Sequence, residues 1–371
     1  MSSTVSKNDS ALESDDKGNP SSTPFFSIGV TTYNRPELLK QTLSSISMQT
    51  FSDFEVIVGN DFIREALSTD TLGIRDSRIR IVNHPQNMGE VRNMNALIDL
   101  GRGRYFTWLS DDDLYAPNFL EDVHSALVKF DFPPCVFTSF EFIHGGGVAD
   151  VEKTPSGQGQ TLSGRQFLRK YWSGKLKAMV CSGVYNKEHL KRIGAVESLA
   201  DTSFALYSEH LLLVRAGLLE QVAYIDEPLV KYRIHDDSWG CTAKDLLLYK
   251  QASGNLIREG AAIFSNPELR DDFRQNMASV LEFVVADFFR RIRMRERVLS
   301  RLDAIPYLIS LKKHFNSLKG SKLYWYALLS WARIGAKMIW WLGTEFNFKA
   351  ATSPGPFRFM RTFHSLFWRH K

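Results

Sequence analysis

The first 110 residues alternate between short apolar runs and segments whose apolar residues are spaced as on a helix. Four runs rich in β-branched and aromatic residues predict strands, at 25–34, 54–61, 78–84 and 104–110. Two intervening segments, 34–48 and 90–100, place their apolar residues on one face and predict amphipathic helices. Strands separated by helices at this spacing indicate an α/β fold, with a mostly parallel sheet flanked by helices.

From about residue 243 onward the pattern is that of helices. We therefore expect an α/β domain over residues 23–240 and a helical, basic, amphipathic region over 241–371. Residues 1–22 are rich in Ser, Asp and Asn and lack an apolar stretch, which predicts a disordered tail rather than a secretory signal. The three cysteines are far apart in sequence and suit a reducing compartment, so we expect a cytoplasmic location.

The net charge of +5 is unevenly distributed. Residues 318–371 hold nine Lys or Arg against one acid, so this segment carries +8 and the rest of the chain −3. The stretch 322–343 is nearly long enough to span a bilayer, but Arg333 and Lys337 fall in its middle, which favours a helix lying on the cytoplasmic membrane surface. The spacing puts its polar residues, Ser330 among them, along one stripe that is expected to face water. Packing on the domain, or on a second subunit of a homo-oligomer, stays open. The density of apolar residues argues against a nucleic-acid partner.

Polar clusters follow three of the predicted strands, at 31–34, 60–61 and 111–113. Parallel strands bring their carboxyl ends to one edge of a sheet, so we expect these clusters to converge. Three consecutive aspartates repel one another unless a cation lies between them. Mg²⁺ or Mn²⁺ takes such oxygen ligands, usually one or two carboxylates plus phosphate oxygens. The alternative is that the aspartates cap a helix expected at 117–130.

The first 240 residues resemble family 2 glycosyltransferases, which have the GT-A fold. Three stretches carry the resemblance, in matching order and spacing: "SIGVTTYNRPELLKQTLSSISMQTFSDFEVIVGND", "NMGEVRNMNALIDLGRGRYFTWLSDDDLYAPNFL" and "EPLVKYRIH". The resemblance implies an inverting enzyme that uses a nucleoside diphosphate sugar, with a UDP-sugar favoured, and a bound Mn²⁺ or Mg²⁺.

The resemblance also assigns roles to single residues. Polar residues after the first strand hold the base and ribose, and Asp61 after the second strand reads the edge of the base. The first aspartate of the triplet faces the ribose and the second faces the metal. The candidate nucleotide-sugar-binding residues are Thr31, Tyr33, Asn34, Arg35, Asp61, Arg92, Asp111 and His235, and the candidate metal ligands are Asp111, Asp112 and Asp113. Asn34 is in addition a candidate N-cap for the helix that follows it, and Pro36 suits that helix's first turn.

Sugar transfer needs a base that removes the proton of the acceptor hydroxyl. Glu209 opens an apolar helix at the place where similar enzymes carry a catalytic Asp, and we expect it to be this base. The alternative is a first-turn Glu that only stabilises the helix dipole. The expected function is transfer to a glycan or lipid-linked acceptor in surface polysaccharide or glycoconjugate assembly. A non-catalytic nucleotide- or glycan-binding module that retains the fold is the other hypothesis.

Overall fold

The structure is a computed structural model, and it describes residues 23–144, 152–155, 157, 159–234, 246–294 and 304–347. The predicted tail, His235, most of the loop 144–160 and the segment 348–371 lie outside the described residues. The expected domain boundary near residue 240 also falls in a segment that is not described, between residues 234 and 246, and it stays a prediction.

Within the described residues, nine strands form one sheet in the order β3-β2-β1-β4-β8-β6-β9-β5, and β7 pairs with β9. The strands are β1 (Phe26–Thr32), β2 (Phe54–Asn60), β3 (Ile79–Asn83), β4 (Tyr105–Ser110), β5 (Leu114–Tyr115), β6 (Cys135–His144), β7 (Gln160–Leu162), β8 (Gly183–Asn186) and β9 (Val222–Ile234). The first four strands pair in parallel as predicted, whereas β8 is antiparallel to both β4 and β6. The sheet is therefore parallel in its first half and mixed in its second.

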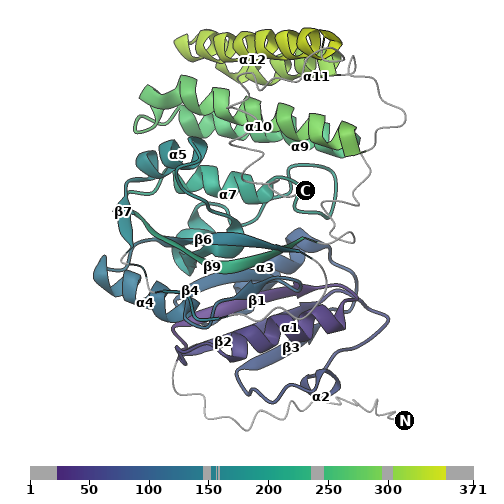
Figure 1. The fold of residues 1–371 in the computed structure, drawn as a ribbon, viewed down its shortest axis with the longest axis vertical. Coiled ribbons are helices and arrows are strands. Elements are labelled where there is room, and N and C mark those ends of the chain that lie inside the picture. The colour runs from purple at the N-terminus through teal and green to yellow at the C-terminus, as the bar shows by residue number, and fades with distance from the viewer. Residues whose placement is uncertain are drawn as a thin grey trace, which may run out of the picture.

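Helices cover both faces of this sheet (Figure 1). They are α1 (Pro36–Ser47), α2 (Thr69–Leu72), α3 (Glu90–Leu100), α4 (Phe119–Lys129), α5 (Gly164–Trp172), α6 (Lys187–Arg192) and α7 (Ser208–Ala216). Alternate side chains of β4 enter different cores, because successive residues of a strand point to opposite faces. Leu109 packs with α1 and α4, and Phe106 and Trp108 pack with α3 and α7. The predicted α/β fold is confirmed.

The prediction that Asn34 caps α1 is wrong. The residue at the N-cap position is Arg35, and no side-chain capping hydrogen bond is formed there. Asn34 instead adopts a left-handed backbone conformation with φ of 56°, which turns the chain between β1 and α1. Pro36 occupies the first turn of the helix, as expected.

The helical C-terminal region stacks on the α7 side of the domain (Figure 1). Its helices are α9 (Leu246–Phe264), α10 (Phe273–Met294), α11 (Ala304–Leu311) and α12 (Lys322–Asn347). One hydrophobic core cluster runs from α3 and β4 through α7 into these helices, so the region shares a core with the domain. Among the described residues, no helix is both long enough and apolar enough to cross a membrane.

Candidate active site

The acidic triplet lies in the turn between β4 and β5, at the carboxyl edge of the parallel half of the sheet. The alternative that these aspartates cap a helix does not apply, because β5 intervenes and the N-cap of α4 is Asn118. The three carboxylates point into different environments. Asp111 faces β1, Asp112 faces the loop after β1, and Asp113 is turned toward β9.

Asp111 is buried and held by the end of β1. Its Oδ2 accepts a hydrogen bond from the Thr32 hydroxyl at 2.7 Å and a longer one, at 3.4 Å, from the backbone amide of Tyr33. Burial raises the pKa of Asp111 to about 6, the Arg35 guanidinium opposes that shift, and repulsion from Asp112 adds to it. Thr32 faces the aspartate and its neighbour Thr31 does not, because successive strand residues point to opposite faces. The expected role of Thr31 in holding the base and ribose stays a prediction.

Arg35 supplies the positive charge that the triplet requires. Its Nη1 lies 2.8 Å from Asp112 Oδ2 and 3.3 Å from Asp111 Oδ1, so one guanidinium bridges two neighbouring carboxylates. Arg35 side-chain exposure is 30%, compared with 13% for Asp112, so this pair opens toward solvent at the rim.

Asp113 is 1% exposed and belongs to the interior of the sheet. Its Oδ1 accepts a hydrogen bond from the backbone amide of Arg233 at 2.9 Å, and its Oδ2 is buried without a hydrogen-bond partner. Burial, followed by repulsion from Asp112, raises its pKa well above the usual range. The Arg233 side chain donates to the Asp112 carbonyl at 2.8 Å and to Gln41 Oε1 at 2.9 Å, so β9 fixes the turn from the other side.

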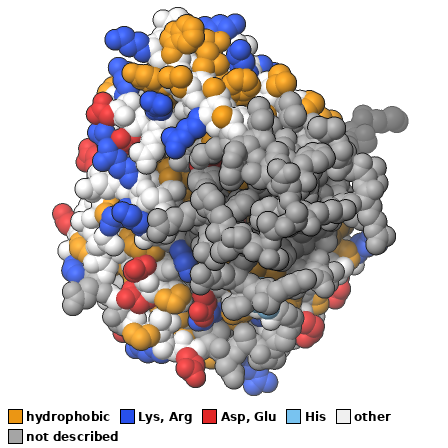
Figure 2. All heavy atoms as spheres, turned by 45° about the horizontal axis from the view of Figure 1, so that its top comes forward, with side chains coloured by type: hydrophobic (Ala, Val, Ile, Leu, Met, Phe, Trp, Pro, Cys, Tyr) orange, Lys and Arg blue, Asp and Glu red, His pale blue; other side chains and the backbone are white. Residues whose placement is uncertain are grey.

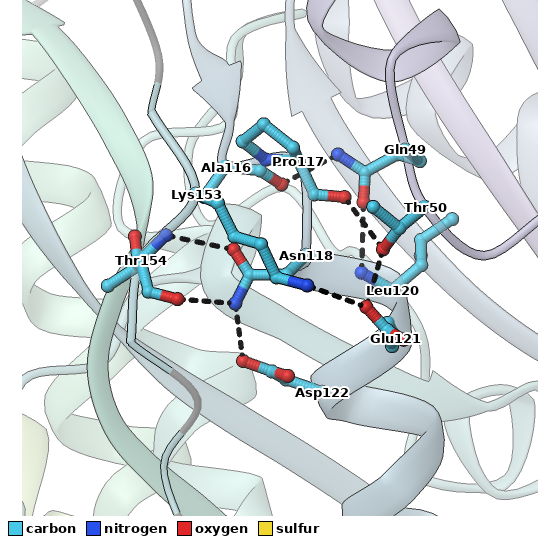
Figure 3. Close-up of polar contacts among 10 residues, drawn as sticks. All are labelled: Gln49, Thr50, Ala116, Pro117, Asn118, Leu120, Glu121, Asp122, Lys153 and Thr154. Atoms are coloured by element: carbon cyan, nitrogen blue, oxygen red, sulfur yellow. Dashed lines mark hydrogen bonds and ion pairs between the residues drawn. The ribbon is translucent and has the colours of Figure 1, made fainter.

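The exit of the turn is held by a network of side chains and backbone groups (Figure 3). Gln49 donates to the Ala116 carbonyl at 2.7 Å and accepts from the Leu120 amide at 3.0 Å, which ties the start of α4 to the end of α1. Asn118, fully buried, donates to Asp122 and exchanges two hydrogen bonds with the backbone of Thr154. This bracing fixes the backbone on which the aspartates sit.

Asp61 is buried at the end of β2, and both of its carboxylate oxygens accept backbone amides. The Met88 amide donates to Oδ1 at 2.8 Å and the Gly89 amide to Oδ2 at 2.7 Å. Asp61 therefore orders the loop that leads into α3, where Gly89 has a φ of 77° that favours glycine. Arg92 is exposed in the first turn of α3. A role of Asp61 in reading the base stays a prediction.

Tyr33 is 51% exposed at the rim, and its ring meets Phe62 edge to face with centroids 5.3 Å apart. Thr31 is partly buried and is paired with Gly59 of β2 and Ser110 of β4. An exposed aromatic ring at the carboxyl edge of parallel strands offers a surface for stacking a planar ligand. The residues predicted after the first strand thus share one rim with the aspartates.

Glu209 occupies the second position of α7, as predicted, and is partly buried. Burial, followed by repulsion from Glu90, raises its pKa to about 7. Glu90 also interacts electrostatically with Arg35 and Asp112, so it lies near both the candidate base and the acidic turn. Sequence reasoning missed Glu90, although its place at the start of a predicted helix beside the rim was a usable signal.

The donor set fits a hard divalent cation. Carboxylates whose pKa values are raised by burial and mutual repulsion are stabilised in their charged form by a nearby cation. In the part of the chain that the structure describes, no three His, Cys, Asp or Glu side chains are grouped as a preformed metal site. Such a site is not required for Mg²⁺ or Mn²⁺, which take one or two carboxylates together with water and phosphate oxygens.

The comparisons with known proteins agree with this architecture. Residues 27–171 match the family described as Glycosyl transferase family 2. The Bacillus subtilis protein EpsH, which carries the name of a glycosyltransferase, is 25% identical over 57% of this chain and 62% of its own length. A glycosyltransferase from Haemophilus influenzae is 28% identical over 57% of this chain and 66% of its own. The chain thus covers less than two thirds of either relative.

Among solved structures, the chain is similar to S. aureus TarS residues 1–349 in complex with UDP-GlcNAc. That likeness has 14% sequence identity and a TM-score of 0.48, and it covers 80% of this chain and 92% of the other.

Proposed function

We propose that this protein is an inverting glycosyltransferase that moves a sugar from a nucleoside diphosphate sugar to a hydroxyl of a glycan or lipid-linked acceptor. The observation that carries the proposal is the convergence of Arg35, Asp111 and Asp112 at the carboxyl edge of the sheet, with the raised-pKa carboxyl of Glu209 on the adjoining helix. The match of residues 27–171, which contain Arg35, Asp111 and Asp112 but not Glu209, to the Glycosyl transferase family 2 model supports it.

In the proposed reaction, separate groups of residues act as the base, bind the nucleoside and hold the metal ion. Glu209 accepts the proton of the acceptor hydroxyl as that oxygen attacks the anomeric carbon from the face opposite the diphosphate, which inverts the configuration. Tyr33, Asn34, Thr31, Asp61 and Arg92 bind the nucleoside. Asp112, supported by Asp111 and with Asp113 behind them, would hold Mn²⁺ or Mg²⁺, and a bound ion supplies neutralisation of the leaving diphosphate.

The test is turnover of a panel of nucleotide sugars, UDP-sugars first, with Mn²⁺, Mg²⁺ or EDTA. We expect metal-dependent hydrolysis or transfer that Glu209→Gln lowers by at least about 10²-fold, in the range for loss of a general base. Glu220→Gln, at an exposed glutamate after α7, is the matched control and should leave the rate unchanged. Donor binding without turnover by the native chain would favour the non-catalytic module instead.

The exposed residues of the C-terminal helices support the proposal that the protein binds to a membrane surface. Trp325 and Leu329 on α12 are 66% and 51% exposed, and Ile309 on α11 is 59% exposed. Figure 2 shows apolar and basic side chains side by side at this end of the molecule. The basic residues of the described surface are Lys312, Lys313, Lys319, Lys322 and Arg333, and the sequence from 304 to 344 contains no acid.

The buried face of α12 differs from the sequence expectation. Ser330, assigned by spacing to a polar, water-facing stripe, is 2% exposed and donates to the Arg274 carbonyl of α10 at 3.1 Å. Ala327 and Ile334 share this buried face. The two α12 tryptophans whose side chains the structure describes therefore differ: Trp331 packs against the core and donates to the Leu308 carbonyl, whereas Trp325 is exposed.

We infer that this surface binds anionic lipid on the cytoplasmic face, where a lipid-linked acceptor in polysaccharide or glycoconjugate assembly would lie. Each basic residue near such a surface contributes about 1 kcal/mol. Vesicles containing phosphatidylserine should sediment the native chain, and Trp325→Ala with Lys319→Glu and Lys322→Glu should abolish this. Equal sedimentation of the triple variant would overturn the inference, and a dimer in solution that the same substitutions dissociate would assign the surface to a second copy.

A further inference from the structure

We propose that Asp287, in the C-terminal helical region, is a positioning residue for the candidate base, and that it acts through the hydroxyl of Tyr207. The proposal rests on the proposed role of Glu209. It gives the C-terminal helices a part in the reaction that is separate from any membrane contact, because α10 then sets where the base of the α/β domain points.

The backbone at the start of α7 is in an unusual conformation. Tyr207, the N-cap residue, has φ of 57° and ψ of 5°, in the left-handed region that bulky side chains adopt rarely. Its side chain makes no capping hydrogen bond to the helix. Ser208 and Glu209 follow directly as the first two residues of α7, so the conformation of Tyr207 sets the direction in which the Glu209 carboxylate leaves the backbone. A strained residue persists where the surrounding structure holds it in place.

The group that holds Tyr207 comes from α10. The Tyr207 hydroxyl donates a hydrogen bond to Oδ2 of Asp287, and both side chains are buried. The Tyr207 ring also meets Phe283 of α10 edge to face at 5.3 Å and Tyr249 of α9 at 5.8 Å. The tyrosine thus reaches out of the domain into a pocket of the C-terminal helices, with a carboxylate at its end.

The next residues of α7 are held in the same way. The His210 ring packs on Phe283 with centroids 4.0 Å apart, and His210 Nδ1 lies 3.3 Å from the hydroxyl of Tyr171 on α5. The Ser208 hydroxyl donates to the Glu197 carbonyl at 2.5 Å. Ser208 and His210, on either side of Glu209, therefore both make contacts that hold the first turn of α7 in place. Glu209, between them, is the residue of this turn that interacts with the acidic groups of the rim.

A base held at the wrong angle loses rate without losing donor affinity, because the donor is bound by the opposite half of the sheet. We therefore expect Tyr207→Phe, which removes one oxygen and keeps the ring, to lower kcat by about 10- to 100-fold while KM for the donor changes by less than about twofold. Tyr105→Phe is the matched control. It removes a buried hydroxyl that donates to the Pro133 carbonyl at 3.0 Å, at the opposite end of β4 from the aspartate turn, and it should leave both constants unchanged.

The deciding experiment is a double-mutant cycle on turnover of UDP-glucose and UDP-N-acetylglucosamine, with Tyr207→Phe made in the native chain and in Asp287→Leu. If Asp287 acts through the Tyr207 hydroxyl, the large kcat effect of Tyr207→Phe disappears in the Asp287→Leu background. An equal effect in both backgrounds, or a loss confined to KM or to thermal stability, would overturn the proposal. Glu209→Gln is measured in parallel: if it leaves kcat intact, the proposed base is wrong, whereas a silent Tyr207→Phe beside an inactive Glu209→Gln refutes only the positioning role.

Discussion

The guanidinium of Arg35 lies 2.8 Å from the carboxylate of Asp112, where a divalent cation that used this aspartate would also have to bind. The same guanidinium is 3.3 Å from Asp111, so the chain neutralises its own acidic turn. A metal ion at Asp112 therefore competes with Arg35 unless the arginine moves. The diphosphate of a donor is a second anion within reach of the rim, and it gives the arginine an alternative partner.

Arg35→Met should strengthen the binding of Mn²⁺ alone, because it removes the competing cation while keeping an unbranched side chain. We expect the dissociation constant, measured by titration calorimetry without nucleotide, to fall by about tenfold, equivalent to about 1.4 kcal/mol. Lys40→Met, at an exposed lysine of α1 that pairs with Glu37, is the control. A Mn²⁺ affinity that does not change in Arg35→Met would show that the cation does not use the Arg35-paired oxygens.

The rate of transfer should depend on pH through Glu209. A general base works when deprotonated, so kcat should rise with pH and reach a plateau above the pKa of about 7 that burial and Glu90 impose. The same shift has the opposite sign for stability: a carboxyl whose pKa is raised on folding loses stability as pH rises from about 4.3 through 7. Glu209→Gln should therefore unfold at a higher temperature than the native chain at pH 8, in a thermal melt.

Glu90→Gln tests the second cause of that shift. The substitution removes a negative charge near Glu209 and keeps an oxygen that accepts the Ala205 amide, now 2.9 Å from the Glu90 carboxylate. We expect the acid limb of the rate profile to move to lower pH, since less repulsion favours the charged base. If the acid limb of the rate profile does not move in Glu90→Gln, the limb reflects the ionisation of a group other than Glu209.

Asp61→Ala should loosen the loop before α3. The variant leaves the Met88 and Gly89 amides without their carboxylate acceptor, and hydrogen bonds to a charged group contribute roughly 1.5–3 kcal/mol each. We expect a loss of at least about 2 kcal/mol in urea unfolding, with a raised KM for the donor. Asp61→Asn keeps one acceptor oxygen but turns an NH2 group toward the other backbone amide, so it should lose part of the same stability. An altered preference between UDP- and other nucleoside diphosphate sugars, measured where the variant is folded, would support reading of the base.

Asp272→Asn should weaken the junction between α5 and the C-terminal helices. Asp272 ends the short turn that directly precedes α10, and it accepts hydrogen bonds from both Arg165 and Arg169, at distances of 2.6–3.2 Å. Burial opposes ionisation of Asp272, but the hydrogen bonds and charges of the two arginines together outweigh it and lower the pKa of Asp272 to about 2. Its contribution to stability should thus be complete above about pH 4 and be lost as pH falls toward 2. Thermal melts of Asp272→Asn should show a lower midpoint at pH 7 that converges with the native chain near pH 2.

Local patterns predicted the first half of the fold well. The apolar face of 90–100 corresponds to α3 with its bounds intact, and Val91, Met94 and Ile98 are all buried. The second half was not predictable in the same way, because β8 and β5 are four and two residues long and join the sheet by antiparallel pairing across long sequence separations. Strands this short carry no period that a sequence alone can show.

The candidate site divides along the same lines. The grouping of Arg35 with Asp111 and Asp112 follows from strand ends, which are readable in sequence. The contact of Arg233 with Asp113 joins residues 120 apart and depends on β9, and the backbone amide that forms it has no sequence signature. Residue spacing likewise assigned Ser330 to a water-facing stripe, because periodicity identifies the faces of a helix but not which of them meets a neighbour.

The parallel half of the sheet ends at β4, where the antiparallel strand β8 joins it. This division suggests where two related proteins could be joined to make a hybrid. All candidate donor-binding residues except His235 lie in or beside the elements up to β5, and the candidate base comes from the chain after β8. A hybrid that joins one protein's first 130 residues to another's remainder would therefore take most of the candidate donor site from one protein and the candidate base from the other. Several contacts cross this seam: Arg233 reaches Gln41 and the aspartate turn, Glu90 accepts the Ala205 amide, and Asn118 bonds to the backbone of Thr154. A designer who exchanges the second half must therefore keep both partners of these contacts, because Arg233 otherwise no longer holds the aspartate turn.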